Sequence, residues 1–367
     1  MNVSKLALAG LLFVSFSHAA SATSVEVEAM SLLQEYNLIT SGNVTSYSEV
    51  DGNALIGGNL SGGMYNMHVT SNAVVSSLTV AGNVQGNVQT KGKGLNVGGD
   101  VSGYITTNDG GNAYVGSVSG TLQNNANGSG SSSVVGDISG NVNTNGGNTI
   151  YGGNLTGSAT ANGGGSVLNQ SISVPFDPAT RASNAITTLD QFSGQLSGVG
   201  ANSSYSITGG KVTFNATADS NGLAIFTIND AKNFFDSAYE FDFNIGSAES
   251  ILFNVFSGTN TDLNLHANFL ANAAPNLGSI LLWNFIDATS LNVQAQFGGS
   301  LLALNADVTT GQNIEGTLVA KSLTQYAEIH SQPSSFVPPS AVPIPAAAFL
   351  FGPALLGFMG LRRKLRA

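Results

Sequence analysis

The sequence predicts an all-β protein built as a parallel β-solenoid, or β-helix, with one amphipathic helix packed on it. An N-terminal signal peptide and a C-terminal transmembrane helix are predicted at its ends. Three observations lead to this fold class. A five-residue unit bounded by glycines recurs in the first half, one central stretch has helical spacing, and apolar segments stand at both ends. Self-similarity at a period of about 20 residues is typical of solenoids.

The repeated unit reads GNLSG in its first full copy, Gly58–Gly62, and recurs in steps of 24, 17, 17, 20 and 17 residues. In an extended segment, alternation turns the one branched apolar residue of each copy inward and its short polar neighbours outward. The flanking glycines allow corners with positive φ. We expect the following residues to line the interior: Leu60, Val84, Val101, Val118, Ile138 and Leu155.

The residue before each inward position is mostly Asn or Asp. These side chains are expected to form a ladder of amide hydrogen bonds along the coil, and they are Asn59, Asn83, Asp100, Ser117, Asp137 and Asn154. The alternative is a flexible linker rich in Gly, Asn and Ser. A linker does not need a branched apolar residue at one fixed place in six copies, so the repeat favours the solenoid.

A single helix is predicted over 177–197. Asp177 is a good N-cap and Pro178 suits the first helical position. Apolar residues then follow with helical spacing, namely Ala182, Ala185, Ile186, Leu189, Phe192 and Leu196. From 204 to 330 the chain reads as strands again, with longer apolar runs and most of the aromatic residues. The sequence leaves open whether this half stacks on the first.

The chain divides into a domain and its flanking segments. The expected ranges are a signal peptide at 1–22, a β-solenoid domain at 23–332 (repeat-rich half 40–175, helix 177–197, second β half 204–330), a Pro- and Ser-rich spacer at 333–341, and a C-terminal segment at 342–367 with an apolar stretch at 344–361. Roughly 310 residues between the end segments are ample for a core.

The N-terminus predicts export. Lys5 precedes an apolar run, Leu6–Phe16, and small residues offer cleavage after Ala19 or Ala22. The apolar run is short for a stable span, so a secretory signal peptide is favoured over a buried N-terminal helix. The sequence has no cysteine, so an exported fold must be held by core burial and backbone ladders rather than by disulfides.

The segment between the two ends is acidic. From 23 to 341 it holds six Lys and Arg against 21 Asp and Glu, a net charge of −15. That sign repels nucleic acid and anionic lipid, so we expect no nucleic-acid partner. The charge suits either divalent cations or a hydrated polysaccharide matrix and does not choose between them.

The sequence offers little catalytic chemistry. Outside the signal peptide the histidines are His68, His266 and His330, and none lies at the spacing of a zinc site. There is no G-x-S-x-G elbow, no thiol and no phosphate loop. Asp100 and Asp137 share a repeat position but lie two rungs apart, so the carboxylates read as scattered, unlike those of a glycosidase. We therefore expect no catalytic residue, no cofactor and no metal ligand.

Two stretches carry a resemblance to a known family. They are EYNLITSGNVTSYSEVDGNALIGGNL near the front and SILLWNFIDATSLNVQAQFGGSLLALNADVTTGQNIEGTLVAKSL near the back. With them the chain resembles the choice-of-anchor A domain family of bacterial exported proteins, over roughly Leu33 to His330. The resemblance implies a non-enzymatic, adhesin-like protein of the cell surface or matrix, and it carries over no ligand residues.

The C-terminal segment resembles the VPxPA variant of the PEP-CTERM sorting signal. The residues that carry the motif and its basic stop are Val342, Pro343, Ile344, Pro345 and Ala346, followed by Arg362, Arg363 and Lys364. A helix over 344–361 spans about 27 Å, a marginal fit to a hydrocarbon core of about 30 Å. The resemblance implies an inner-membrane intermediate in a Gram-negative bacterium and cleavage by an exosortase-type enzyme, with a permanent anchor as the alternative. The missing Glu of PEP and the interrupting Pro353 depart from the family pattern.

The leading hypothesis is a non-enzymatic exported protein, displayed on the cell surface or released into the exopolysaccharide matrix. Its expected partners are an exosortase-type processing enzyme, an exopolysaccharide or other surface glycan, and, at least transiently, the membrane. Two alternatives remain. One is an ice- or glycan-binding solenoid, for which the threonines form no evident outward column, and the other is a polysaccharide lyase.

Overall fold

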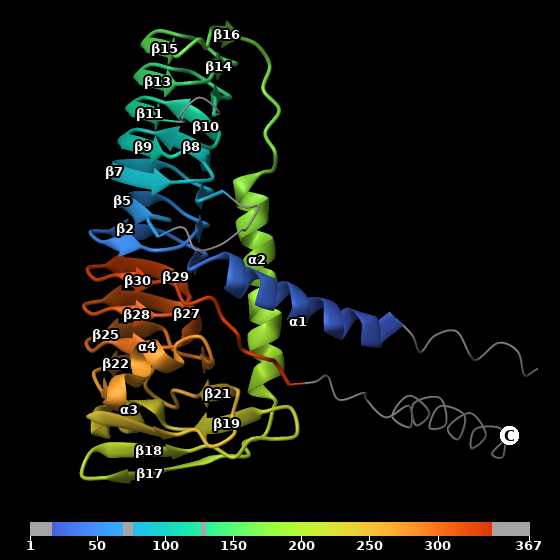
Figure 1. The fold of residues 1–367 in the computed structure, drawn as a ribbon, viewed down its shortest axis with the longest axis vertical. Helices are drawn as coiled ribbons and strands as arrows, with labels where there is room; N and C mark the ends of the chain where they lie inside the picture. The colour runs from blue at the N-terminus through green and yellow to red at the C-terminus, as the bar shows by residue number, and fades with distance from the viewer. Residues whose placement is uncertain (1–16, 69–75, 126–129, 340–367) are drawn as a thin grey trace, which may run out of the picture.

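Parallel strands stack in three ladders that wind into one β-coil, drawn upright in Figure 1. The computed structural model describes residues 17–68, 76–125 and 130–339. Several longer strands bend at a corner of the coil and therefore belong to two ladders. This arrangement is the parallel β-solenoid that the glycine repeat predicts.

Each ladder runs from the lower to the upper end of the coil in Figure 1. Ladder 1 contains β19 (Leu223–Ile228), β21 (Ser250–Val255), β24 (Leu281–Phe285), β27 (Ser300–Thr310), β29 (Leu318–Gln325), β1 (Leu38–Thr40), β4 (Ala54–Ile56), β6 (Leu78–Val80), β8 (Leu95–Val101), β10 (Ala113–Val118), β12 (Ser132–Val134), β14 (Thr149–Tyr151) and β16 (Val167–Asn169). Ladder 2 contains β22 (Asp262–Leu265), β25 (Ser290–Val293), parts of β27 and β29, β2 (Val44–Ser46), β5 (Leu60–Tyr65), β7 (Val84–Lys91), β8 and β10. Ladder 3 contains β26 (Phe297–Gly298), β28 (Ile314–Glu315), β30 (Ile329–His330), β3 (Glu49–Val50), parts of β5 and β7, β9 (Tyr104–Asn108), β11 (Thr121–Asn125), β13 (Asn141–Asn145) and β15 (Ser158–Asn162).

A separate four-stranded sheet closes the lower end of the coil. It contains β17 (Ser204–Thr208), β18 (Lys211–Asn215), β20 (Glu240–Asn244) and β23 (Asn268–Phe269), and its β17–β18 pair is antiparallel. Above it, Phe253 stacks on Phe226 with ring centroids 5.0 Å apart and on Trp283 with centroids 3.7 Å apart. The second half of the chain therefore has an aromatic core, as its composition indicates.

The two halves of the chain form one continuous coil, which answers the question that the sequence left open. From β1 the coil climbs to β16, α2 (Pro178–Ser197) carries the chain down the side, and later rungs climb back to β29 and β30 (Figure 1). There the last rung pairs with the first, in the register Leu38–Leu318, Val44–Leu323 and Val50–Ile329. We call this junction of β29 and β30 with β1, β2 and β3 the seam.

The interior of the upper half follows the repeat with one exception. Five of the predicted inward residues are buried, namely Leu60, Val84, Val101, Val118 and Ile138. Leu155 is 38% exposed, so its expected burial is wrong. It belongs to the last copy of the repeat, and no further copy stacks on it at the upper end of the coil.

Asn59, Asn83 and Asp137 of the repeat bind backbone N–H groups of the next rung, whereas Asp100 binds the hydroxyls of Ser117 and Ser119. The side-chain oxygen of Asn59 accepts from the N–H of Asn83 at 2.8 Å, and Asn83 accepts in the same way from Asp100 at 2.8 Å. The expected amide-to-amide ladder is therefore wrong at this position. The side chain of Asn59 lies over Gly82 on the next rung in order to reach the N–H of Asn83. The residue that precedes the Asn or Asp of that next rung must therefore be a glycine. A Cβ on Gly82 would lie only 2.5 Å from Asn59 Oδ1.

The last glycine of the repeat is required by close approach between rungs. A Cβ on this glycine would collide with a backbone carbonyl oxygen of the rung below, as at Gly120 over Gly103 and at Gly140 over Gly120. The two glycines of the unit thus have different tasks in most copies. The first makes room for a capping side chain at Gly58, Gly82, Gly99 and Gly153, and the last lets the corners stack.

Helix α2 lies along ladder 1, over the range in which a helix is predicted. Asp177 Oδ2 accepts from the N–H of Thr180 at 3.0 Å, and Pro178 occupies the first turn. The apolar face of the helix is buried against outward residues of ladder 1, which are Ile39, Leu55, Leu252, Leu282, Leu302 and Val319. The helix therefore covers the side of the coil, because ladder 1 is apolar on both of its faces there.

The prediction of a single helix is incomplete. The structure also contains α1 (Ser17–Glu35) and the short helices α3 (Ala231–Ser237) and α4 (Ala273–Leu277). Helix α1 crosses α2 in Figure 1, and Arg181 of α2 lies 3.4 Å from Glu35 and donates to the Tyr36 hydroxyl at 3.1 Å. The prediction assigned the start of this helix to a signal peptide and missed the helical spacing of Ala29, Leu32 and Leu33, which form its buried face.

The predicted end segments fall partly within the described residues. Ala19 and Ala22 lie in α1, and cleavage after either leaves the buried residues Ala29 and Leu33 in the chain, so processing there stays a prediction. The predicted spacer begins on the fold, because Phe336 is buried against the helices. No helix within the described ranges is long and apolar enough to cross a membrane. The motif at 342–346, the apolar stretch 344–361 and the basic stop at 362–364 lie outside those ranges.

Replacing Gly140 by Ala tests the stacking of the corners. Its Cβ would meet Gly120 backbone, so we expect Gly140→Ala to lower the free energy of unfolding by about 1–3 kcal/mol. Gly200→Ala is the control, because no atom lies within 4 Å of a Cβ at Gly200. Urea unfolding followed by circular dichroism measures both variants. Equal stability of the two variants would contradict this account of the repeat.

Candidate functional site

The outward surface of ladder 3 is the free face of the coil on which polar groups gather. Helix α2 covers ladder 1, whereas the outward side chains of ladder 3 are half-buried or exposed along its upper strands. We call this surface, from β26 to β15, the ladder 3 face. Its upper part is neutral and its lower part, at the seam, is charged.

The upper part is a regular array of amides and hydroxyls on β9, β11, β13 and β15. Residues in register form three outward columns, which are Tyr104–Thr121–Asn141–Ser158, Thr106–Gln123–Asn143–Thr160 and Asn108–Asn125–Asn145–Asn162. In the third column each amide donates to the one below it, at 3.0, 2.9 and 2.9 Å. None of these twelve side chains is charged. Neighbouring rungs are about 4.8 Å apart, so the array repeats at that distance.

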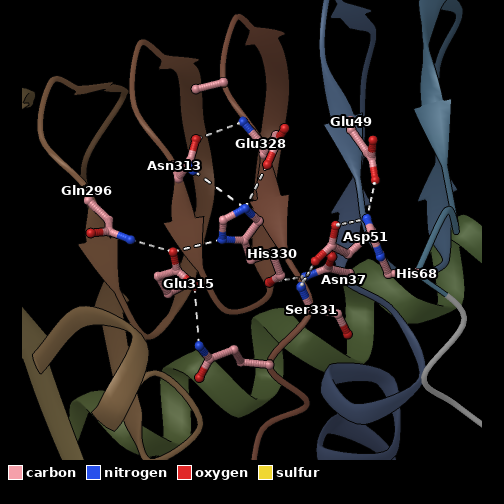
Figure 2. A network of polar contacts seen from close by, with 12 residues as sticks. Asn37, Glu49, Asp51, His68, Gln296, Asn313, Glu315, Glu328, His330 and Ser331 are labelled. Carbon is pink, nitrogen blue, oxygen red and sulfur yellow. Dashed lines mark hydrogen bonds and ion pairs between the residues drawn. The ribbon is translucent and has the colours of Figure 1, made fainter. Parts of the chain in front are cut away.

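The lower part of the ladder 3 face carries a cluster of titratable groups, drawn in Figure 2. The cluster consists of Glu49, Asp51, His68, Glu315, Glu328 and His330. Strands β28, β30 and β3 hold Glu315, His330 and Glu49 on adjacent rungs. Glu328 directly precedes β30, Asp51 directly follows β3, and His68 follows β5. The parallel pairing at the seam thus joins acids from the two ends of the domain.

His330 bridges two carboxylates at the centre of the cluster. Its Nδ1 lies 2.8 Å from Glu315 Oε1 and its Nε2 lies 2.8 Å from Glu328 Oε2. Burial lowers the pKa of His330, but hydrogen bonds with Glu328 and Glu315 and their charges outweigh it, so the pKa is raised above 6.5. Contacts of both ring nitrogens with carboxylates are the geometry of an imidazolium, which donates twice.

Glu315 is the buried acid of the cluster, with a side chain only 4% exposed. Besides His330 it faces two amides, Gln296 Nε2 at 2.6 Å and Gln332 Nε2 at 3.3 Å. Asp51 Oδ2 accepts from the N–H of Ser331 at 2.9 Å. These carboxylates are therefore engaged in holding the last rungs to the first.

Glu49, Asp51 and His68 form a second group beside the first. His68 Nε2 lies 3.0 Å from Glu49 Oε1 and 3.9 Å from Asp51 Oδ1. Burial raises the pKa of Glu49, and His68 opposes this shift. The ligand atoms of the three residues lie within 4.8 Å of one another. Imidazole nitrogen and carboxylate oxygen are ligands of divalent transition metals, so these residues could hold such a cation.

Comparison with known proteins gives one family. A family model described as "Putative Ice-binding-like adhesive domain" matches residues 29–133 and 110–331, which include the whole coil and the seam. The chain belongs to this family. The chain matches no curated protein and no solved structure. The family description names an adhesive domain. It is consistent with the adhesin-like character that the sequence predicts.

The remaining predicted residues lie apart from the cluster. Asp100 and Asp137 are two rungs apart, with Ser117 between them, and Asp100 Oδ1 accepts from Ser117 Oγ at 2.8 Å. His266 lies edge-on against Tyr239, with ring centroids 5.6 Å apart.

The expectation that carboxylates are scattered is wrong at the seam, because four of them meet there. The acids at 49, 51, 315 and 328 carry no motif along the chain. Only the pairing of the last rung with the first brings them together, so no sequence signal could have found the cluster.

Replacing His330 by Gln tests the charge at the centre of the cluster. Because the pKa of His330 is raised on folding, its protonated form contributes stability that is complete below pH 6.5 and is lost as pH rises through the folded value. We expect the melting temperature of the wild type to fall more steeply than that of His330→Gln as the pH rises above 6.5. His266→Gln is the matched control. The same slope in His330→Gln and the wild type would contradict this assignment.

Proposed function

We propose that the protein is a non-enzymatic adhesin of the cell surface or extracellular matrix that binds polymers through its ladder 3 face. The observation that carries the proposal is the neutral array on β9, β11, β13 and β15. An array in register offers a polymer many weak hydrogen bonds at once, and simultaneous contacts multiply affinity. The amide column from Asn108 to Asn162 is already ordered by its own hydrogen bonds, so less side-chain entropy is lost on binding.

The geometry of the seam supports a structural role for its acids over a catalytic one. Glu315, Glu328 and Asp51 all have protein partners within hydrogen-bond distance. The cavity beside them, lined by Asn37 and Asn53 among others, has a volume of about 10 Å³. That is room for one water molecule and not for a sugar. This arrangement argues against the polysaccharide lyase.

A charged patch on the array tests the binding face. The double variant Thr106→Glu/Asn141→Glu places two carboxylates among neutral neighbours, and neither side chain has a hydrogen-bond partner among the described residues. We expect roughly a tenfold loss of retention in the exopolysaccharide matrix, because lost contacts multiply. The control is Ser183→Glu/Asn184→Glu, which adds the same charge to the exposed side of α2. Retention is measured as the cell-bound fraction in a deletion strain, and equal retention of the two variants would overturn the proposed face.

The proposed route to the surface is export followed by C-terminal sorting. The resemblance of the tail to a PEP-CTERM signal supports cleavage by an exosortase-type enzyme in a Gram-negative envelope. The structure adds that Val337 still docks on the coil, where its N–H donates to Ser250 Oγ at 2.9 Å. The 342–346 motif follows Val337 by five residues along the chain.

Intact mass of the protein recovered from cells and medium tests the sorting step. We expect a mature form that ends near residues 343–346, because the tail is removed after insertion. Pro343→Ala/Pro345→Ala is expected to retain residues 361–367, since both prolines keep the motif extended. Pro338→Ala/Pro339→Ala, upstream of the motif, is the control. A wild-type protein that keeps its tail would show a permanent anchor instead.

Ice is the second candidate ligand, favoured by the family description and by the regular ladder 3 face. The outward columns mix Thr, Asn, Gln and Ser, so no column of threonines alone is present on β9, β11, β13 and β15. Thermal hysteresis of the purified protein, abolished in Thr106→Glu/Asn141→Glu, would favour ice over a glycan.

A further inference from the structure

We propose that a groove at the corner between ladders 2 and 3, next to the seam, binds a hexose ring of a neutral polysaccharide. This inference rests on the proposed adhesive function, for which it names a site and a ligand class. The groove lies on β2, β5 and β7 and the turns beside them, and its volume is about 530 Å³. Tyr47, Gly62, Gly86, Asn87 and Gln89 are among the residues that line it.

An aromatic platform forms one end of the groove. Tyr47 is 69% exposed and stacks on Tyr326, which is 60% exposed, with ring centroids 5.2 Å apart and planes within 7°. These two tyrosines occupy equivalent corners on the two sides of the seam. Tyr326 covers one face of the Tyr47 ring and fixes its orientation, which leaves the other face free toward the groove that it lines. The C–H face of a sugar ring packs well on a flat, held aromatic ring.

The hollow beside Tyr47 is enforced by the backbone. Gly62, Gly63 and Gly86 have φ of +72°, +98° and +68°, a region that side chains disfavour. At Gly62 a Cβ would also lie 2.6 Å from the carbonyl oxygen of Ser46. Two successive rungs therefore present bare backbone at this corner. Two rungs span about 10 Å, which is wide enough for one pyranose ring.

Polar side chains at the rim are available to a ligand. Asn87, Gln89, Ser48 and Ser61 line the groove, and none of their side chains has a hydrogen-bond partner among the described residues. The amides of the third column on β9 to β15, in contrast, are bonded to one another. Free amides and hydroxyls around an aromatic ring match the hydroxyl rim and apolar face of a sugar.

The absence of charged residues from the groove lining favours a neutral polysaccharide as the ligand. No Asp, Glu, Lys, Arg or His is among the residues that line it. The carboxylates of Glu49 and Glu328 lie at the nearby seam. The segment from 23 to 341 has a net charge of −15. An acidic polysaccharide would meet repulsion in the groove, because no Lys, Arg or His lines it.

The groove opens onto the ladder 3 face. Asn87 lies in register with Tyr104, which is 47% exposed, and Gln89 lies in register with Thr106. A polymer held at the groove can therefore continue along the first two columns of the neutral array. The groove binds one sugar ring of the polysaccharide, and the neutral array makes weaker contacts with the adjoining sugar rings.

Calorimetric titration of the purified full-length protein with cellohexaose, laminarihexaose and maltohexaose tests the site, and an alginate hexamer is the anionic comparison. We expect at least one neutral hexasaccharide to bind, and both Tyr47→Ala and Asn87→Ala to weaken it roughly 5- to 10-fold. Tyr239→Ala is the matched control, because Tyr239 is 61% exposed and lies apart from the groove. Melting temperatures verify that each variant is folded, and Asn87→Ala leaves the Tyr47–Tyr326 stack in place.

Each result decides one of the two proposals. Unchanged affinity in both Tyr47→Ala and Asn87→Ala, no binding of any neutral hexasaccharide, or equal binding of the alginate hexamer would each overturn the groove. If Thr106→Glu/Asn141→Glu still lowers matrix retention in that case, the adhesive function stands without it. If retention is also unaffected, the proposed function fails together with the site.

Discussion

The structure depends on the pairing of the last rung of the coil with the first. Without it, the upper and lower halves would each end in open strand edges at this level, which is where sheets tend to aggregate. Buried amides reinforce the pairing on both sides. Asn37 Nδ2 donates to the Gly316 carbonyl at 2.8 Å, and Gln325 Nε2 donates to the Glu49 carbonyl at 2.7 Å. One continuous apolar core then runs through both halves.

The functional features also gather at this junction. The bridge from His330 to Glu315 and Glu328, the Tyr47–Tyr326 stack and the groove beside it are formed by, or adjoin, rungs that meet at the seam. Of these contacts, the Tyr47–Tyr326 stack joins residues separated by most of the domain, so its formation carries a large loop-closure cost. Binding at the groove is thus tied to completion of the whole fold.

The two ends of the coil are stabilised by different means. The lower rungs stack large rings, as in the Phe226–Phe253–Trp283 column, and a separate sheet closes them. The upper rungs bury small aliphatic side chains, such as Leu95, Val101 and Ile105, and add side chain-to-backbone bonds such as that from Asn83 to Asn59. Helix α2 connects the two ends and uses ladder 1 as its packing surface, which leaves ladder 3 free to bind.

The sequence by itself determined the coil and its helix. Gly58–Gly62 and its later copies specify corners, inward residues and spacing, and Asp177 specifies where α2 begins, because these are local requirements of φ, alternation and capping. Tertiary structure alone decided that the last rung is the neighbour of the first. The meeting of Tyr47 with Tyr326, and of Asp51 with the N–H of Ser331, depends on register between strands far apart in the chain. Parallel pairing sets that register, and no local pattern encodes it.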